Sequence, residues 1–272
     1  MILYHDDYRQ TDIFKFLKEL EWENHYYNYA KYFERPNPKV KRLKNIGTGQ
    51  RCFILGNGPS LNLLDLSLLK REITFGVNSI FLNYENMGFE PTYYVVEDPL
   101  VARERALEIN SLVSNSIKFI YRRYADIIFE TEKTVYFQMY DYFGYNGFPY
   151  FSTEFDKYCW IGGTVSYTCM QLAFYLGFSS VYLIGFDHKY SISMSSKING
   201  LSIRTLHDDE NHFHPDYFGK GTTWHIPNVE RMETSYKKAK KVYEKSGRKI
   251  YNATKGGALE VFERVDFVSL FS

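Results

Sequence analysis

A glycine-rich turn beginning at Gly56 is the part of this sequence best suited to bind a phosphate group. Gly56 and Gly58 allow the backbone to approach an anion closely, and Asn57 adds a side-chain amide. An α-helix predicted to begin near Ser60 would direct its unpaired N–H groups and its positive dipole end at the same anion. The Gly-Lys-Ser/Thr ending of a Walker loop is missing, and Leu61 replaces the third glycine of the dinucleotide fingerprint. A purely structural turn is the alternative.

A long polar segment at residues 188–226 contains the side chains best suited to acid–base chemistry. Four of the seven histidines lie between His207 and His225, and histidine titrates where a general base must work. Segments of this length in compact α/β domains are usually lids or binding loops, so we expect the chemistry here. Two alternatives are open: the histidines and carboxylates of residues 208–216 hold a divalent ion, or they only hydrogen-bond the loop to itself.

Further polar residues end predicted strands. Asn78, Asp98 and Asp187 each follow an apolar run, and the ligands of an open parallel sheet bind outside the carboxyl ends of its strands. Lid residues could also stabilise a departing phosphate by hydrogen bonds or charge, although packing or surface roles are the alternative for each of them. These lid residues are Lys189, Tyr190, Tyr217 and Lys220.

Six short apolar runs, rich in β-branched and aromatic residues, predict the strands that position these groups. They are Arg51–Gly56, Ile73–Asn78, Thr92–Asp98, Lys118–Arg122, Val181–Asp187 and Lys249–Thr254. Helical patterns separate several of the strands, and two of these patterns end just before a glycine. The two helices are Gly163–Leu176 and Val229–Lys245. This alternation predicts an α/β, Rossmann-like fold whose mostly parallel sheet carries helices on both faces.

The chain divides into a short extension and one domain. Its 272 residues can bury one large core and do not require two equal domains. Residues 11–34 mix aromatic and charged residues at helical spacing. We therefore expect a helical N-terminal extension at 1–45 and a nucleotide-binding α/β domain at 46–272, with the lid at 188–226.

Five motifs follow one another in a characteristic order. They are Gly-Asn-Gly-Pro-Ser-Leu at 56–61, Asn78, Glu-Asp-Pro at 97–99, the helix opening Ile161–Ser166, and Gly-Phe-Asp at 185–187. This series resembles the bacterial CMP-sialic acid-dependent sialyltransferases. It is at least as similar to a broader family that contains the archaeal 6-hydroxymethylpterin diphosphokinases and the flagellar motility accessory factors. The resemblance runs from about Arg51 to Phe267 and implies a variant of the GT-A-like glycosyltransferase fold.

The resemblance implies roles for individual residues. The glycine-rich turn would hold the donor nucleotide, and the turn at 163–166 would grip the donor sugar. His225, just before the penultimate helix, matches the general base, and His212 would shape the site. Asp98 replaces an asparagine of the family, and the family's phosphate-binding tyrosine falls near Tyr190. With the lid residues added, the expected donor-binding set is Gly56, Asn57, Gly58, Ser60, Asn78, Asp98, Gly163, Thr164, Ser166, Asp187, Tyr190, Tyr217 and Lys220.

The implied function is transfer of a CMP-activated sialic or other nonulosonic acid to a saccharide hydroxyl of a surface glycan. In a direct inverting displacement, His225 would take the acceptor proton while lid donors stabilise the leaving CMP. A single phosphate needs no metal ion, so we expect neither a cofactor nor a metal site. The alternative is an ATP-dependent diphosphokinase of the 6-hydroxymethylpterin type, in which Asp98, Asp187 and lid carboxylates hold magnesium. A non-catalytic nucleotide-sugar-binding protein is a third hypothesis.

Charge and composition narrow the cellular context. Lys+Arg 33 against Asp+Glu 32 leaves a net charge of +1, which provides no global field for binding nucleic acid. The 3 cysteines are widely spaced, as is typical of a reducing compartment. Neither a signal peptide nor a run of about 18 apolar residues is visible. We expect a cytoplasmic protein. Association with the inner face of the membrane through a lipid-linked acceptor, and assembly into a homo-oligomer, are both compatible with this sequence.

Overall fold

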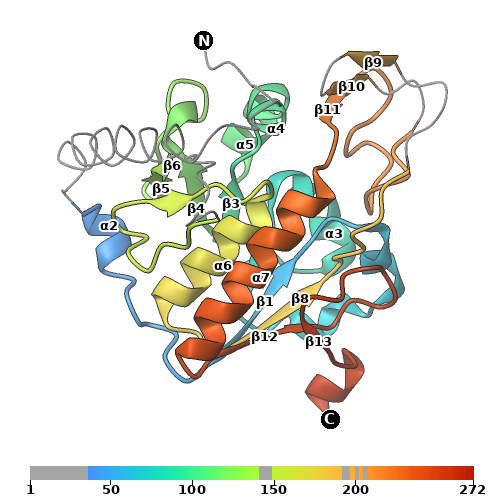
Figure 1. Cartoon of the computed structure of the whole chain (residues 1–272). Helices are drawn as coiled ribbons and strands as arrows, with labels where there is room; N and C mark the ends of the chain where they lie inside the picture. Colours follow the sequence, from blue (N-terminus) through green and yellow to red (C-terminus); the bar gives the residue numbers. More distant parts are fainter. Residues whose placement is uncertain (1–35, 141–148, 192–196, 200–201, 205–207) are drawn as a thin grey trace, which may run out of the picture.

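A parallel β-sheet forms the centre of the protein (Figure 1). The computed structural model describes residues 36–140, 149–191, 197–199, 202–204 and 208–272. Within these residues, eight strands run in the order β13-β12-β8-β1-β2-β3-β4-β5, and every neighbouring pair is parallel. All six predicted strands are present, which confirms the Rossmann-like α/β class. The strands are β1 (Arg51–Leu55), β2 (Thr74–Val77), β3 (Tyr93–Val96), β4 (Ile117–Tyr121), β5 (Thr134–Phe137), β8 (Ser180–Ile184), β12 (Lys249–Asn252) and β13 (Glu263–Arg264).

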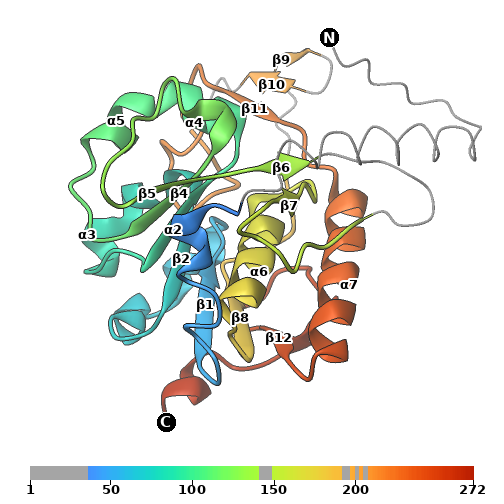
Figure 2. The same cartoon turned by 90° about the vertical axis from the view of Figure 1, so that its left-hand side faces the viewer.

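Helices cover both faces of this sheet (Figure 2). Side chains alternate along β1, so that Cys52 and Ile54 belong to one hydrophobic core whereas Phe53 and Leu55 belong to the other. Residues of α6 and α7 complete the first core, and residues of α3, α4 and α5 complete the second. These helices are α3 (Tyr84–Met87), α4 (Pro99–Glu104), α5 (Ala106–Ser111), α6 (Val165–Leu176) and α7 (Val229–Lys245).

The two longest helices begin and end at recognisable caps. The side chain of Thr164 accepts a hydrogen bond from the Ser166 N–H at the start of α6, and Gly177 ends this helix with a φ of 97°. At the start of α7, the side chain of Asn228 accepts from the Arg231 N–H. Both predicted helices are therefore confirmed, and α6 begins slightly later than expected because its N-cap lies outside the helical turns.

Several short elements differ from the prediction. The lid, expected to be nearly strand-free, contains an antiparallel sheet of β9, β10 and β11. Each of these strands has three residues, which is shorter than the runs of about four to eight residues that predict a strand. The short elements are β6 (Met139–Tyr140), β7 (Cys159–Trp160), β9 (Lys197–Asn199), β10 (Ser202–Arg204), β11 (Thr223–His225), α2 (Pro38–Lys41), and the 3₁₀ helices η1 (Pro59–Leu63), η2 (Leu66–Leu69), η3 (Asn78–Asn83), η4 (Arg122–Tyr124) and η5 (Val268–Phe271).

The first part of the described chain covers one edge of the sheet. β5 is the last strand on its side. The side-chain amide of Asn37 donates to the carbonyl of Tyr136 at 2.9 Å, and Lys39 Nζ donates to the carbonyl of Thr134 at 3.1 Å. These contacts occupy part of an edge that would otherwise be open to pairing. The helix predicted at 11–34 lies outside the described residues. Within the described part of the chain, no helix has the length and apolar character needed to cross a membrane.

Candidate functional site

The polar strand ends meet where the strand order reverses direction. From β1 the chain continues to β2 on one side, whereas β8 pairs with β1 on the other side. The turns that follow β1 and β8 therefore lie next to each other. The Gly56 N–H donates to the Ile184 carbonyl at 2.7 Å, and the Gly58 N–H donates to the Gly185 carbonyl at 3.0 Å. Ligands of open parallel sheets bind at such a point.

The carboxylate of Asp187 takes the anion position of the glycine-rich turn. Its Oδ2 accepts from the Ser60 hydroxyl at 2.6 Å and from the Ser60 N–H at 3.3 Å. A Cβ atom on Gly58 would overlap this carboxylate oxygen, so the close approach of the two turns requires glycine. Gly58, Ser60 and Asp187, three residues of the expected donor-binding set, are thus brought together.

The prediction of an α-helix beginning near Ser60 is wrong. The segment forms the short 3₁₀ helix η1, its N-cap is Gly58, and it ends at Leu64, whose backbone is extended. Pro59 lies in the first turn, and the Ser60 N–H is directed to a side chain of a neighbouring turn. Because a 3₁₀ helix this short has little dipole, phosphate binding at this turn would depend on close backbone approach.

A second cluster joins the lid to the ends of β1 and β2. The hydroxyl oxygen of Tyr217 accepts from Asn57 Nδ2 at 2.7 Å, and the side chain of Asn78 and the backbone of Ser79 lie close enough to lower its pKa. Burial, with Asp98 nearby, raises the pKa of Tyr217, so that the phenol stays neutral. Four residues of the predicted site therefore lie close together, although the chain separates them widely.

His212 lies against this cluster and is held by an aspartate. Its Nδ1 is 2.7 Å from Asp209 Oδ2, and its ring stacks on that of Tyr217 with the centroids 4.0 Å apart and the planes 2° from parallel. Asp209 also accepts from the N–H groups of Asn211 and Phe218. The pair therefore organises the lid from within, and its position is compatible with the expected role of His212 in shaping the site.

Backbone contacts fasten this part of the lid to the domain. The Phe213 N–H donates to the Asn57 carbonyl at 2.9 Å, and Asn62 Nδ2 donates to the Phe213 carbonyl at 2.8 Å. At the α4–α5 junction, the guanidinium of Arg105 donates to the carbonyl of Asp216. The lid segment that carries Tyr217 is thus anchored to η1 and to the α4–α5 junction.

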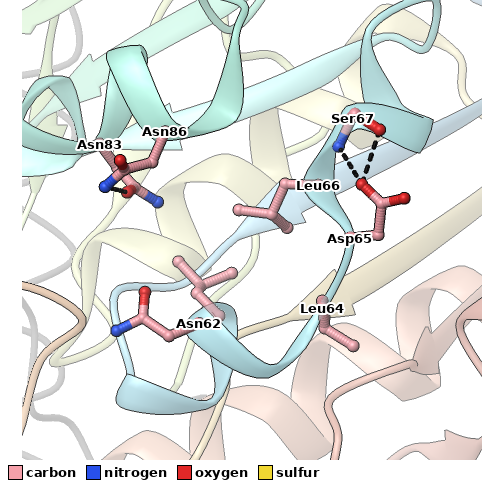
Figure 3. A pocket seen from close by; sticks show the side chains of 8 residues that line it. Asn62, Leu64, Asp65, Leu66, Ser67, Asn83 and Asn86 are labelled. Atoms are coloured by element: carbon pink, nitrogen blue, oxygen red, sulfur yellow. Dashed lines mark hydrogen bonds between the residues drawn. The ribbon is translucent and has the colours of Figure 1, made fainter.

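A pocket of about 310 Å³ lies between η1, η2 and the η3–α3 segment (Figure 3). On one wall, Asn86 Nδ2 donates to Asn83 Oδ1 at 3.2 Å, and on another the Ser67 N–H and hydroxyl donate to Asp65. None of the expected donor-binding residues lines it. The lining residues are Leu61, Asn62, Leu64, Asp65, Leu66, Ser67, Asn83 and Asn86.

The two carboxylates at the end of β3 have protein partners. Asp98 accepts from the N–H groups of Leu100 at 2.7 Å and Val101 at 3.1 Å, and so caps α4. Glu97 accepts from the hydroxyl of Thr168 on α6. A metal ion or a ligand donor at this strand end would have to compete with these hydrogen bonds.

Hydroxyl groups gather where α6 and α7 begin. The hydroxyl of Tyr236 lies close enough to the side chains of Thr164 and Ser166 for them to lower its pKa, although burial raises that pKa overall. Gly163 has a φ of 78°, and a Cβ atom there would lie 3.1 Å from Cδ of Arg231. Three more residues of the expected donor-binding set therefore lie together, against two residues of α7 that the sequence analysis did not single out.

The loop that follows β12 also reaches the central turn. The Ala258 N–H donates to the Asp187 carbonyl at 2.8 Å, and a Cβ atom on Gly257 would lie 3.0 Å from the Asp187 Cα. Tyr190 is close by on the lid, since burial and then the Asp187 charge raise the pKa of Tyr190 to about 12. This loop was not predicted to reach the site, although Lys255 and two glycines directly after a predicted strand were an available signal.

His188 is another residue of this region that the sequence analysis missed. Its backbone has a φ of 52°, which is uncommon outside glycine, and its side chain is 4% exposed. Its Nε2 is 3.5 Å from Glu233 Oε1, and its ring centroid is 5.9 Å from that of Tyr236. The available signal was a histidine directly after the Gly-Phe-Asp strand end.

We expect His188 to make the free energy of unfolding fall as the pH drops below about 6.5. Burial lowers the pKa of His188, against an opposing effect of Glu233, so the unfolded chain takes up this proton more readily than the folded chain. His188→Asn removes the titration and keeps a residue that tolerates positive φ. In urea unfolding at about pH 7.5 and 5.5, the variant should lose less stability than the wild type. An equal loss in both proteins would contradict this assignment.

His225 and Lys220 lie apart from these clusters. Both side chains are exposed, and His225 pairs with Ser202 across β11 and β10. The neighbouring Trp224 is buried and stacks on Phe218, with the ring centroids 6.2 Å apart. The position of His225 is therefore fixed by β11, and among the described residues it has no contact with the turns after β1 and β8. Its role as general base stays a prediction.

Comparison with known proteins adds one finding. A family model described as 6-hydroxymethylpterin diphosphokinase MptE-like matches residues 23–193, more than half of the chain. The matched region contains β1 to β8 and therefore both central turns. A search of curated proteins found no match. In the described ranges, no group of three or more His, Cys, Asp and Glu side chains is arranged to hold a metal ion.

Proposed function

Because the chain belongs to the 6-hydroxymethylpterin diphosphokinase MptE-like family, we propose that it is a transferase whose nucleotide substrate binds beside the turns after β1 and β8. The observation that carries this proposal is the convergence of Asn57, Asn78, Asp98 and Asp187 at the carboxyl edge of a parallel sheet. Short polar side chains and close backbone approach at this edge suit a nucleotide.

The reaction that we propose is glycosyl transfer from a CMP-linked sialic or other nonulosonic acid to a saccharide hydroxyl. The hydroxyls of Thr164, Ser166 and Tyr236 support it, because such a group of donors and acceptors suits a polyhydroxylated sugar. Neither Asp98 nor Asp187 is needed as a metal ligand in this reaction, since a monophosphate needs no metal ion. We also propose a cytoplasmic location, in which a lipid-linked acceptor would bring the protein to the inner face of the membrane.

The mechanism is a single inverting displacement. The acceptor oxygen attacks the anomeric carbon of the donor sugar while the bond between this carbon and the CMP phosphate oxygen breaks. The acceptor proton passes to His225. Hydrogen-bond donors of the lid, Tyr190 and Lys220, stabilise the negative charge on the departing phosphate.

The family match favours a second candidate, an ATP-dependent diphosphokinase acting on 6-hydroxymethylpterin. Magnesium that also binds substrate phosphates needs only one or two protein carboxylates. Asp98 and Asp187 would supply them here. Each would have to give up hydrogen bonds, Asp98 to the start of α4 and Asp187 to Ser60. Only the diphosphokinase requires these two carboxylates to exchange their hydrogen bonds for a metal ion.

Chelation separates these candidates. If the donor is a CMP-sugar, release of CMP from CMP-sialic acid should continue in excess EDTA, because no diphosphate charge needs a cation. The matched assay offers ATP and 6-hydroxymethylpterin with magnesium and then with EDTA, and measures AMP. Activity only in the second assay, lost with EDTA and restored by magnesium, would replace the glycosyltransferase proposal by the diphosphokinase.

A binding screen tests the broader proposal. Nucleotide binding stabilises the folded state in proportion to the logarithm of saturation. Thermal unfolding with CMP, UDP, GDP and ATP, each with and without magnesium, should therefore identify the nucleotide by a rise in Tm. If none of the four raises Tm, the proposed nucleotide-binding transferase is wrong.

A further inference from the structure

The hydroxyl oxygen of Tyr217 lies among polar groups at the ends of β1 and β2. Asn57 Nδ2 donates to it at 2.7 Å, and the side chain of Asn78 and the backbone of Ser79 are close enough to lower its pKa. We call Asn57, Asn78 and Ser79 the polar cradle. The Tyr217 side chain reaches it from the lid and is almost completely buried.

The cradle contains more hydrogen-bonding capacity than a phenol can satisfy. Asn57 Oδ1, Asn78 Oδ1 and Ser79 Oγ are buried and have no hydrogen-bond partner among the described residues. The orientation of the Asn57 amide is set by its second bond, from Nδ2 to the Val77 carbonyl at 3.1 Å. Buried acceptors are normally paired. The cradle therefore suits a group that carries both acceptors and N–H or O–H donors on one edge.

The space above the cradle suits a flat ring. The His212 ring lies parallel to that of Tyr217 at 4.0 Å between centroids. Phe213 and Phe218 meet the same ring edge-on, at 5.9 Å and 5.0 Å. A planar heterocycle in this space would stack on His212 and present its polar edge to the cradle.

We propose that the polar cradle is the binding subsite for a planar heterocycle with a lactam- or amidine-type edge, and that Tyr217 fills this subsite until the ligand displaces it. Cytosine and pterin rings both carry such an edge, with adjacent donors and acceptors. The inference rests on the proposed function, because it names the part of the substrate that this site recognises.

Displacement of Tyr217 would also loosen the lid. The same segment is held by the Phe213 N–H on the Asn57 carbonyl and by Asp209 on the Phe218 N–H. When the ring leaves, the ligand takes its place against His212, and the segment that carries Tyr217 loses its deepest anchor. Ligand binding and opening of residues 213–218 are then one event, and the observed affinity is reduced by the fraction of molecules whose cradle is filled by Tyr217.

The test uses Tyr217→Phe, which keeps the ring and removes the oxygen that occupies the cradle. With the cradle donors left unpaired, the filled state becomes less favourable, so the variant should bind CMP or 6-hydroxymethylpterin roughly tenfold more tightly than the wild type. Phe218→Leu is the matched control, because it weakens lid packing and leaves the cradle intact. Isothermal titration with each probe shows which heterocycle the cradle takes, and the control should show no gain in affinity.

Hydrogen exchange of the wild-type protein gives a second readout that needs no variant. Saturation with the bound heterocycle should speed amide exchange at Phe213 and Phe218, because both amides lose their partners when the lid segment opens. Unchanged or weaker binding by Tyr217→Phe, or slower exchange at these amides, overturns the inference and leaves the proposed function standing. Absence of binding of either probe, and of UDP, GDP and ATP, to the wild type and to Tyr217→Phe overturns both.

Discussion

Replacement of His225 by alanine is expected to lower kcat for glycosyl transfer by about 10²–10⁴-fold. An acceptor hydroxyl is a poor nucleophile until its proton is removed, and a positioned base supplies this much of the rate. The donor Kd should stay nearly unchanged, since the base contacts the acceptor and not the nucleotide. Steady-state kinetics with CMP-sialic acid, combined with titration of CMP, measures the two effects separately.

Two other lid histidines serve as comparisons. His214→Ala should keep kcat within about threefold of the wild type, because the contacts of this partly exposed ring are local to its loop and include acceptance from the Asp216 N–H at 3.1 Å. His212→Ala should also lower the stability of the lid, since Asp209 loses a partner. If His225→Ala retains kcat and one of the other variants loses it, the base is assigned to the wrong lid histidine. If all three remain active, no lid histidine is the general base.

Substitution of Gly58 by alanine should destabilise the protein by about 1–3 kcal/mol and abolish the rise in Tm with nucleotide. The new Cβ would overlap Asp187 Oδ2 and lie 2.8 Å from the Gly185 carbonyl. The turn after β1 and the turn after β8 would have to separate, and the Ser60 hydroxyl would lose its 2.6 Å hydrogen bond. Urea unfolding gives the stability change, and thermal unfolding with CMP gives the loss of binding.

A double-mutant cycle tests the cause of this effect. Asp187→Ala removes the oxygen that the new methyl group meets, so Gly58→Ala should cost less in the Asp187→Ala background than in the wild type. Strict additivity would mean that the carboxylate moves aside freely, and that Gly58 is needed for some other contact.

The elements that were predicted correctly are those whose signal is local. Runs such as Arg51–Leu55 are apolar and β-branched because both faces of a parallel strand are buried. The starts of α6 and α7 are marked by Thr164 and Asn228, whose side chains accept hydrogen bonds from N–H groups two or three positions further along the chain. Because parallel strands end at the same edge of a sheet, the polar residues that follow several strands could also be placed together from the sequence.

The contacts that could not be predicted join residues far apart in the chain. Asp187 reaches Ser60 only because β8 pairs with β1, and no local pattern states which strand lies beside β1. Tyr217 was a candidate ligand for a phosphate, yet its closest partner is Asn57, which depends on how the lid folds back. His188 carries no motif of its own, and its interest comes from burial beside Glu233, which lies on α7.

The position of β8 between β1 and β12 also sets the order in which the sheet can be completed. During synthesis, β2 to β5 emerge directly after β1 and can pair in sequence on one side of it, but the other side of β1 stays open until Ser180–Ile184 have been made. An open edge of Cys52, Phe53 and Ile54 is apolar and suited to pairing with another chain. Nascent chains that stop before β8 should therefore aggregate or recruit chaperones, and refolding should be limited by the long loop closure that brings β8 to β1.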